Sequence, residues 1–316
     1  MKKNTKRILF IAGTTVEAMY AYNKFIAYTA AEKKLLSREN GEIFSWKHGD
    51  IFYTKRGTGS PLLLIHDADP TSSSAEWNKI IHKLEKQHTV YAIDLLGCGL
   101  SDKPAVDYTN YMYVQLIESF VNEIIGEKTI VVATNMSAAF TIMANHINNS
   151  LFKEMILINP VSMQKLNIIP DKLSKIKRAF IQLPFIGTFI YNLFTNSIKI
   201  DEAFHNKYYA KSQLVSSTLK DIYYEAAHTN NSNGRFLFSS ILGNYINNNI
   251  SHAVKKLTTP TLIIGSNNIK GNTHILDDYH KLNSNLDIMR INNGNLYPHM
   301  EIPEKITSII HNYLSK

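Results

Sequence analysis

Cysteine is almost absent from this sequence, since Cys98 stands alone among 316 residues. A single cysteine excludes an internal disulfide framework and a cysteine-rich metal site. The twelve histidines are scattered, and no His-x-x-x-His pair stands beside a carboxylate as in zinc-binding helices. A glycine-rich loop of the kind that cradles phosphates is missing too. We therefore expect neither a metal nor a cofactor.

Charged residues are also few, at 19% of the chain against 44% hydrophobic residues. These values are typical of a folded globular protein and exclude a disordered chain. The net charge of +8 is compatible with nucleic acid or an anionic membrane as partner. No nucleic-acid-binding motif accompanies this charge, so we expect no nucleic-acid partner. The length fits one α/β domain that carries an insertion.

The chain opens with a basic, then apolar segment. Four basic residues within positions 2–7 precede Ile8–Ala30, and about 20 apolar residues are enough to span a bilayer. Glu17 and Lys24 interrupt this stretch, and a charge at mid-membrane costs roughly 2.5–3.5 kcal/mol. We expect residues 1–35 to form a hydrophobic helix that associates the chain with a membrane, on a side the sequence does not specify. Four interpretations of this segment remain open. It is a signal-anchor helix, an amphipathic helix in the membrane interface, a cleaved signal peptide, or a helix that packs on this chain's own domain in a cytoplasmic protein.

From residue 44 onward, β-rich runs alternate with helical ones, the pattern of a mostly parallel sheet wrapped by helices. The predicted strands are 44–46, 51–55, 62–65, 89–93, 129–133, 155–158, 261–264 and 286–291. The predicted helices are 74–86, 111–125, 138–148 and 301–314. Residues 161–256 keep a helical pattern without strands, and we interpret them as a cap over the carboxyl edge of the sheet. The α/β core then comprises 44–160 and 257–316.

Three motifs follow predicted strands. The first is Leu63-Leu-Ile-His66-Asp67-Ala68, and the second is Asp94-Leu-Leu-Gly-Cys-Gly-Leu-Ser-Asp-Lys-Pro104. The third, Ile130–Ala139, has small residues two positions before and two positions after Asn135. Together they resemble the α/β-hydrolase family, with its His-Gly strand end, its Asp-x-x-Gly-x-Gly-x-Ser-x-x-Pro loop and its Gly-x-Ser-x-Gly nucleophile turn. The resemblance extends from about residue 44 to residue 316, cap included.

The resemblance places Asn135 at the nucleophile position. It also implies that the backbone N–H groups of Ala68 and Met136 form the oxyanion hole. Asparagine tolerates a positive φ better than most residues, so the turn can persist without its nucleophile. Asp67 stands where the family usually has glycine, and an aspartate facing a developing oxyanion would oppose it.

The other two triad positions are altered as well. In Gly265-Ser-Asn-Asn268, Asn268 occupies the acid position, where it has no charge to stabilise an imidazolium. The segment 295–304 resembles Gly-His-x-Pro-x-x-Glu-x-Pro-Glu, and Leu296 falls on the histidine. Loss of triad members leaves only about 10³–10⁴-fold catalysis over water. We therefore predict a membrane-associated pseudo-hydrolase that binds a small hydrophobic ligand or a partner protein.

Two alternatives remain open at this point. The chain could be an active, esterase- or lipase-like hydrolase with displaced groups such as Ser137 and His299. We favour a packing role for Ser137, one turn into a helix, and a helix-start or surface position for His299. The cap segment 179–194 is apolar and aromatic, and lysines precede it. We interpret it as the underside of the cap, while contact with an anionic bilayer or with a lipid-like ligand is the alternative.

Overall fold

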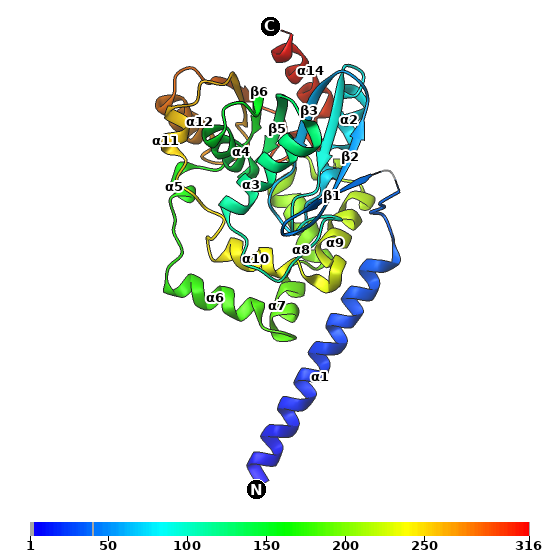
Figure 1. The fold of residues 1–316 in the computed structure, drawn as a ribbon. Helices are drawn as coiled ribbons and strands as arrows, with labels where there is room; N and C mark the ends of the chain where they lie inside the picture. Colours follow the sequence, from blue (N-terminus) through cyan, green and yellow to red (C-terminus); the bar gives the residue numbers. More distant parts are fainter. Residues whose placement is uncertain (1–2, 40, 316) are drawn as a thin grey trace.

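The computed structural model describes residues 3–39 and 41–315, with the side chains of 3–9, 11 and 12 left aside. Over this part of the chain an eight-stranded sheet forms the centre, in the order β1-β2-β4-β3-β5-β6-β7-β8 (Figure 1). The strands are β1 (Glu42–Trp46), β2 (Gly49–Arg56), β3 (Ser60–Ile65), β4 (His88–Ile93), β5 (Thr129–Thr134), β6 (Phe152–Ile158), β7 (Thr261–Ser266) and β8 (Asp287–Ile291). The pairs β1–β2 and β2–β4 are antiparallel, and the other neighbours are parallel. The predicted mostly parallel sheet is confirmed.

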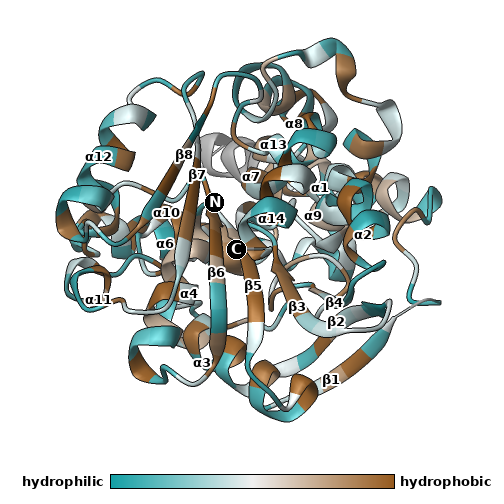
Figure 2. Cartoon of the chain, turned by 90° about the horizontal axis from the view of Figure 1, so that it is seen from above, coloured by the Kyte–Doolittle hydropathy of each residue, from teal (hydrophilic) through white to brown (hydrophobic). Residues whose placement is uncertain are grey.

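Helices cover both faces of the sheet, which explains why the central strands are continuous apolar runs (Figure 2). On one face, α3, α4, α11 and α12 pack against Leu63, Val131 and Leu157, and on the other α2 and α14 pack against Leu64 and Val132. The bounds are α2 (Asn78–Leu84), α3 (Asn110–Phe120), α4 (Met136–Ile147), α11 (Ser251–Lys255), α12 (Asn272–Leu282) and α14 (Pro303–Leu314). The short elements η1 (Ser74–Trp77) and η2 (Val121–Ile125) lie within the predicted helices 74–86 and 111–125, and the short helix α13 (Pro298–Glu301) precedes α14.

Sequence reasoning missed α12. Only Asn272, Leu276 and Tyr279 of this helix are buried. Its apolar stripe is therefore too narrow to stand out from the surrounding polar residues.

The segment between β6 and β7 is helical and covers the carboxyl ends of the parallel strands (Figure 1). Its elements are α5 (Met163–Leu166), α6 (Lys172–Gln182), α7 (Ile186–Phe194), α8 (Ser197–Ala203), η3 (Phe204–Tyr208), η4 (Ser212–Leu214), α9 (Ser217–Ser232) and α10 (Arg235–Leu242). An aromatic cluster joins this cap to the core: it contains Phe204, Tyr208 and Tyr223 from the cap and Leu296 and Tyr297 from the core. Cap and core thus share one apolar interior.

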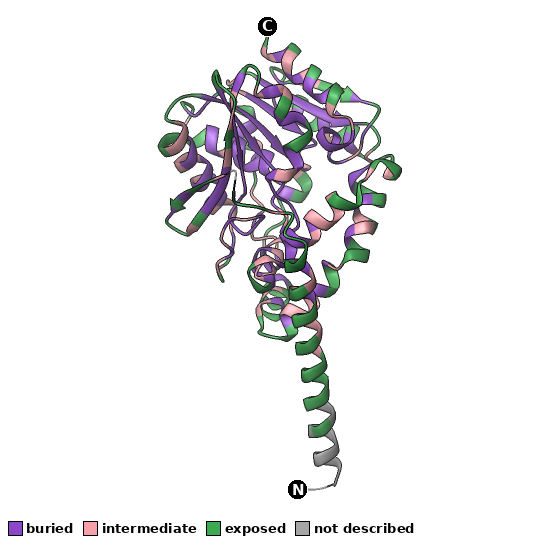
Figure 3. Cartoon of the chain, turned by 90° about the vertical axis from the view of Figure 1, so that its right-hand side faces the viewer, coloured by how far each residue is buried: buried purple, intermediate pink, exposed green. Residues whose placement is uncertain are grey.

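The N-terminal helix α1 (Lys3–Glu32) lies partly against the cap and partly outside it. Its second half packs on α7 and α9, with Tyr22 and Phe189 edge to face at 5.3 Å. The Asn23 side chain donates to the carbonyl of Phe185 at 3.1 Å. Its first half extends away from the domain (Figures 1 and 3), where residues 13–18 are exposed. The basic side chains at positions 2–7 lie outside the described residues.

Among the helices that the structure describes, none is both long enough and apolar enough to cross a membrane.

Candidate functional site

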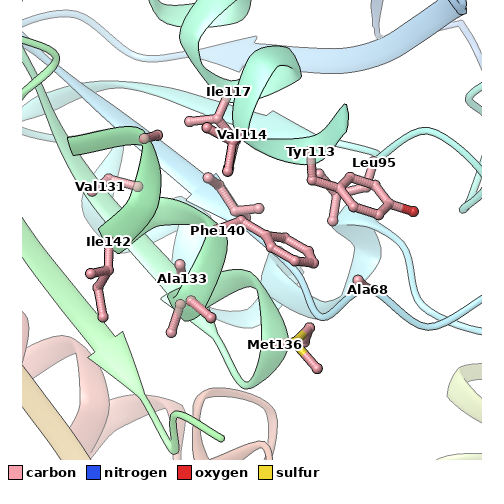
Figure 4. Packing of buried hydrophobic residues seen from close by; sticks show 14 of the residues in the cluster. Ala68, Leu95, Tyr113, Val114, Ile117, Val131, Ala133, Met136, Phe140 and Ile142 are labelled. Carbon is pink, nitrogen blue, oxygen red and sulfur yellow. The ribbon is translucent and has the colours of Figure 1, made fainter. Parts of the chain in front are cut away.

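The turn between β5 and α4 has the backbone shape of a nucleophile elbow. Asn135 sits at φ 46° and ψ −113°, between the end of a buried strand and the first residue of a helix. Such a conformation costs about 1–3 kcal/mol and persists only where neighbours enforce it. Here the Asn135 N–H donates to the carbonyl of Ile158 at 3.0 Å, and α4 is anchored by Phe140 stacked on Tyr113 at 4.8 Å (Figure 4). The turn is therefore held by the fold although no hydroxyl or thiol projects from it.

Asp67 fills the space in front of this turn. Its Oδ1 accepts the backbone N–H of Met136 at 3.1 Å. Its Oδ2 accepts the side-chain amide of Asn135 at 2.6 Å and the hydroxyl of Tyr297 at 2.9 Å. Met136 and Ala68, the two positions expected to form the oxyanion hole, are both buried (Figure 4). The Asp67 carboxylate thus accepts the hydrogen bond of the Met136 N–H, which would otherwise stabilise a substrate oxyanion.

The remaining triad positions lie in loops at the same edge of the sheet. Asn268 follows β7, and its amide donates to the carbonyl of Gly294 at 3.1 Å. Leu296 follows β8 and is buried in the aromatic cluster. Asn159 ties these loops together, because its amide donates to the carbonyl of Leu296 at 2.9 Å and its oxygen accepts the N–H of Ser266 at 2.8 Å. Tyr297, the neighbour of Leu296, reaches Asp67, so the loop after β8 does approach Asn135.

Ser137 and His299 lie in different surroundings. The Ser137 hydroxyl is buried and donates to the carbonyl of His66 at 2.6 Å. The His299 ring is fully buried and stacks on Trp77 at 4.2 Å. The prediction of a surface histidine is therefore wrong, although His299 does lie in the short helix α13. The His299 ring is buried, and not on the surface, because it stacks on the indole of Trp77.

A buried ionisable pair accompanies this histidine, and sequence reasoning missed it. Glu76 Oε2 lies 3.8 Å from His299 Nε2, and Glu76 Oε1 accepts the hydroxyl of Tyr223 at 2.8 Å. Burial raises the pKa of Glu76 to about 7, although the nearby His66 opposes this shift. Burial lowers the pKa of His299 to about 3. Neither imidazole nitrogen of His299 has a hydrogen-bond partner among the described residues. Such a histidine stays neutral and makes a poor general base near neutral pH.

The loop Asp94–Pro104, the longest motif match, has a structural role. The Asp94 carboxylate accepts the N–H groups of Ser74 at 2.6 Å and Leu100 at 2.7 Å. Gly99 has φ +47°, and an added Cβ would lie 2.1 Å from that carboxylate. The loop therefore requires glycine here because the aspartate passes so close.

The cap is fastened to the core by buried polar contacts as well as by the aromatic cluster. The Glu301 carboxylate accepts the backbone N–H groups of Ala210 at 2.9 Å and Lys211 at 2.7 Å. Tyr208 from the cap packs against Tyr297 with ring centroids 4.9 Å apart. Cavities of about 450 and 270 Å³ lie along α1 and not at Asn135.

Comparison with known proteins agrees with this architecture. The model of the α/β hydrolase fold matches residues 61–301, and the chain belongs to this family. A 2-hydroxy-6-oxo-6-(2'-aminophenyl)hexa-2,4-dienoic acid hydrolase from Metapseudomonas resinovorans is 26% identical over 108 residues, 34% of this chain and 37% of that protein. A haloalkane dehalogenase from Agrobacterium fabrum is 29% identical over 28% of this chain and 29% of that protein. The chain thus matches only about a third of the length of these curated relatives.

Solved structures share the fold over nearly the whole chain. An epoxide hydrolase, CorEH without ligand, superposes with a TM-score of 0.71 at 18% identity and covers 87% of this chain and 98% of its own. A membrane phospholipase A, described as a bacterial virulence factor, has a TM-score of 0.68 at 15% identity. That match covers 100% of this chain, α1 included, and 98% of the other. At these identities the likeness shows the fold alone.

Proposed function

We propose that this chain is a hydrolase-fold protein that does not form an acyl-enzyme and that acts as a binding protein at a membrane surface. The proposal that no acyl-enzyme forms rests on one observation, the hydrogen bond that the Met136 N–H donates to the Asp67 carboxylate. A tetrahedral intermediate needs that donor for its oxyanion, and a fixed negative charge in the same place opposes it. Asn135 and Leu296, at the nucleophile and histidine positions, offer neither a nucleophile nor a base.

The surroundings of Ser137 and His299 argue against a displaced catalytic pair. The buried Ser137 hydroxyl donates its hydrogen bond to the backbone carbonyl of His66. The His299 ring faces Trp77 and Glu76. A serine is activated only when its hydroxyl lies within hydrogen-bond reach of the base.

Membrane association is supported by an exposed apolar face formed by α1, α6 and α7. On α6 the exposed side chains include Ile176, 65% accessible, and Phe180, 49% accessible. Among the described side chains of α1, the α6 region and α7, the exposed apolar ones are Phe10, Val16, Tyr20, Phe25, Tyr28, Ile168, Ile169, Leu173, Ile176, Phe180, Leu183, Phe185, Ile186, Leu193 and Phe194. So many exposed apolar side chains together mark an interaction surface.

The charge of this face indicates an anionic bilayer as its partner. Lys172, Lys175 and Lys177 are exposed on the same helix as Ile176 and Phe180. Basic residues beside apolar ones suit a helix that lies in the headgroup region of anionic lipid. A membrane phospholipase A whose structure covers this whole chain, α1 included, supports the same setting. A hydrophobic small molecule under the cap is the weaker candidate, because the aromatic cluster occupies that space.

We expect the purified full-length protein to remain unlabelled by a fluorophosphonate probe. The reason is that Asn135 occupies the nucleophile position and that the Met136 N–H, the oxyanion donor, already donates to Asp67. Labelling would be measured by mass spectrometry of the intact chain, with a serine esterase as positive control. Labelling that disappears in Ser137→Ala would show that Ser137 is a working nucleophile and that the proposal is wrong.

The double variant Ile176→Ser/Phe180→Ser should bind vesicles of mixed phosphatidylcholine and phosphatidylglycerol at least about tenfold more weakly than the wild type. The reason is that burial of each of these side chains in the bilayer is worth roughly 1.5–3 kcal/mol. Co-sedimentation measures the partition coefficient, and salt should weaken binding. The matched control is Ile147→Ser, because Ile147 is equally exposed but ends α4 at the opposite edge of the sheet. Equal binding by the double variant and the control would contradict the assignment of this face.

A further inference from the structure

A cavity of about 270 Å³ separates α1 from the cap at the turn between α9 and α10. This volume is just below the roughly 300–1,000 Å³ typical of small-molecule sites. Its polar lining consists mainly of Lys24, Thr188, Asn231, Ser232, Asn233 and Arg235. Two cations thus line the cavity together with hydroxyl and amide groups, and no carboxylate does.

Neither of the two cations has a counter-ion among the described residues. Neither Lys24 nor Arg235 lies within 4.0 Å of a carboxylate oxygen in the part of the chain that the structure describes. Arg235 donates from one terminal nitrogen to Asn233 Oδ1 at 2.8 Å. Its Nε is buried and has no hydrogen-bond partner among the described residues. Burial lowers the pKa of Arg235. The half-buried guanidinium lies over the Phe236 ring at 4.3 Å and keeps one buried donor unused, an arrangement that an accompanying anion would stabilise.

The turn beside Arg235 has an unusual backbone. Asn230, Asn231 and Ser232 have φ values of 54°, 55° and 59°, all in the left-handed region. The two asparagines tolerate this conformation well, whereas at Ser232 it costs about 1–2 kcal/mol. Strain of this kind gathers at ligand sites, where the surroundings enforce it. Two of these residues, Asn231 and Ser232, line the cavity.

We propose that this cavity binds a phosphate-type oxyanion, with Arg235 and Lys24 as its charged partners. A guanidinium matches such an anion through paired N–H donors, and Lys24 adds a point charge. Tyr20, Pro184 and Phe185 form the apolar wall of the same cavity and belong to, or adjoin, the exposed face of α1 and α7. The anion can therefore be a lipid phosphate or a free phosphate. The lipid source, but not the site itself, rests on the proposed membrane association.

Isothermal titration of the full-length protein with inorganic phosphate, and with a short-chain, water-soluble phosphatidic acid, tests this site. Arg235→Gln should weaken binding of whichever probe binds by about tenfold or more. Lys24→Gln should weaken it less, and Arg235→Lys should lie between Arg235→Gln and the wild type. Lys255→Gln is the matched control, because Lys255 is an exposed cation on α11, outside both the cavity and the apolar face. Circular dichroism would establish that each variant is folded.

The outcomes separate the two sources and the two proposals. Phosphate binding without phosphatidic acid binding identifies a free anion. Tighter binding of phosphatidic acid than of phosphate, with phosphate competing for the site, identifies a lipid. No binding of either probe, or unchanged affinity in folded Arg235→Gln, would overturn the site. Probe binding that persists while the protein fails to bind vesicles would leave the site standing and refute the membrane association.

Discussion

Replacing the three altered triad positions together, as Asn135→Ser, Asn268→Asp and Leu296→His, is expected to leave the protein inactive toward short-chain aryl esters until Asp67→Gly is added. The triple variant restores a nucleophile, a base and an acid, but the Met136 N–H still donates to the Asp67 carboxylate. Removing one oxyanion donor from a working enzyme costs about 10²–10³-fold in kcat. Freeing that donor should therefore raise the esterase rate by about the same factor.

The single variant Asp67→Gly serves as the control and should stay inactive, because no nucleophile is present. Activity would be followed as release of the aryl alcohol, and thermal unfolding would verify that each variant is folded. Two results would contradict the interpretation. A triple variant as active as the quadruple variant would show that Asp67 does not block the site. A folded but silent quadruple variant would show that the triad positions are assigned to the wrong residues.

The second large effect concerns stability and the buried carboxyl group of Glu76. Its pKa in the folded state is raised to about 7 from 4.5. The folded state thus holds this proton more tightly than the unfolded state, so the stabilisation is complete below pH 4.5 and is lost as the pH rises to 7. Because each pKa unit corresponds to 1.36 kcal/mol, the loss is of the order of 3 kcal/mol. Glu76→Gln cannot ionise and can still accept the hydroxyl of Tyr223, so it should escape this loss.

Urea unfolding at a series of pH values from 4.5 to 8 would measure the effect through the midpoint concentration. The variant should be close to the wild type at pH 4.5 and more stable at pH 8. His299 contributes the opposite dependence: its pKa is lowered to about 3, so its stabilisation is complete above pH 6.5 and is lost as the pH falls. Glu202→Gln, at an exposed position on α8, controls for the change of net charge. Parallel curves for Glu76→Gln and the wild type would mean that Glu76 is not held protonated.

The sheet could be predicted from the sequence because its signal is local. Each central strand is a short apolar run bounded by turn residues, and all of the predicted strands are present. The position of the elbow could also be predicted from the sequence, because the small residues at 133 and 137 identify Asn135 as the residue between them at its centre. These features depend on neighbours along the chain, and periodicity reports them well.

The site itself depends on contacts between distant segments, which a single sequence does not reveal. Tyr297 and Asp67 are 230 positions apart, and nothing in either motif announces their hydrogen bond. Glu76 follows three serines and an alanine in what resembles an ordinary helix start, so its burial against His299 and Tyr223 has no local signal. The sequence did predict that an aspartate at position 67 would oppose a developing oxyanion. What the sequence could not show is that the carboxylate would reach the Met136 N–H.

The contacts of the cap determine how this protein can move. Glu301 holds the cap backbone at Ala210 and Lys211, while Tyr223 of the cap donates to Glu76 of the core. Opening the cap would leave buried polar groups without partners and would separate the shared aromatic cluster. We therefore expect the cap to stay closed over the core and the two to unfold together. For the same reason we expect a ligand to bind at the outer surface, where the apolar face of α1, α6 and α7 and the cavity beside Arg235 lie.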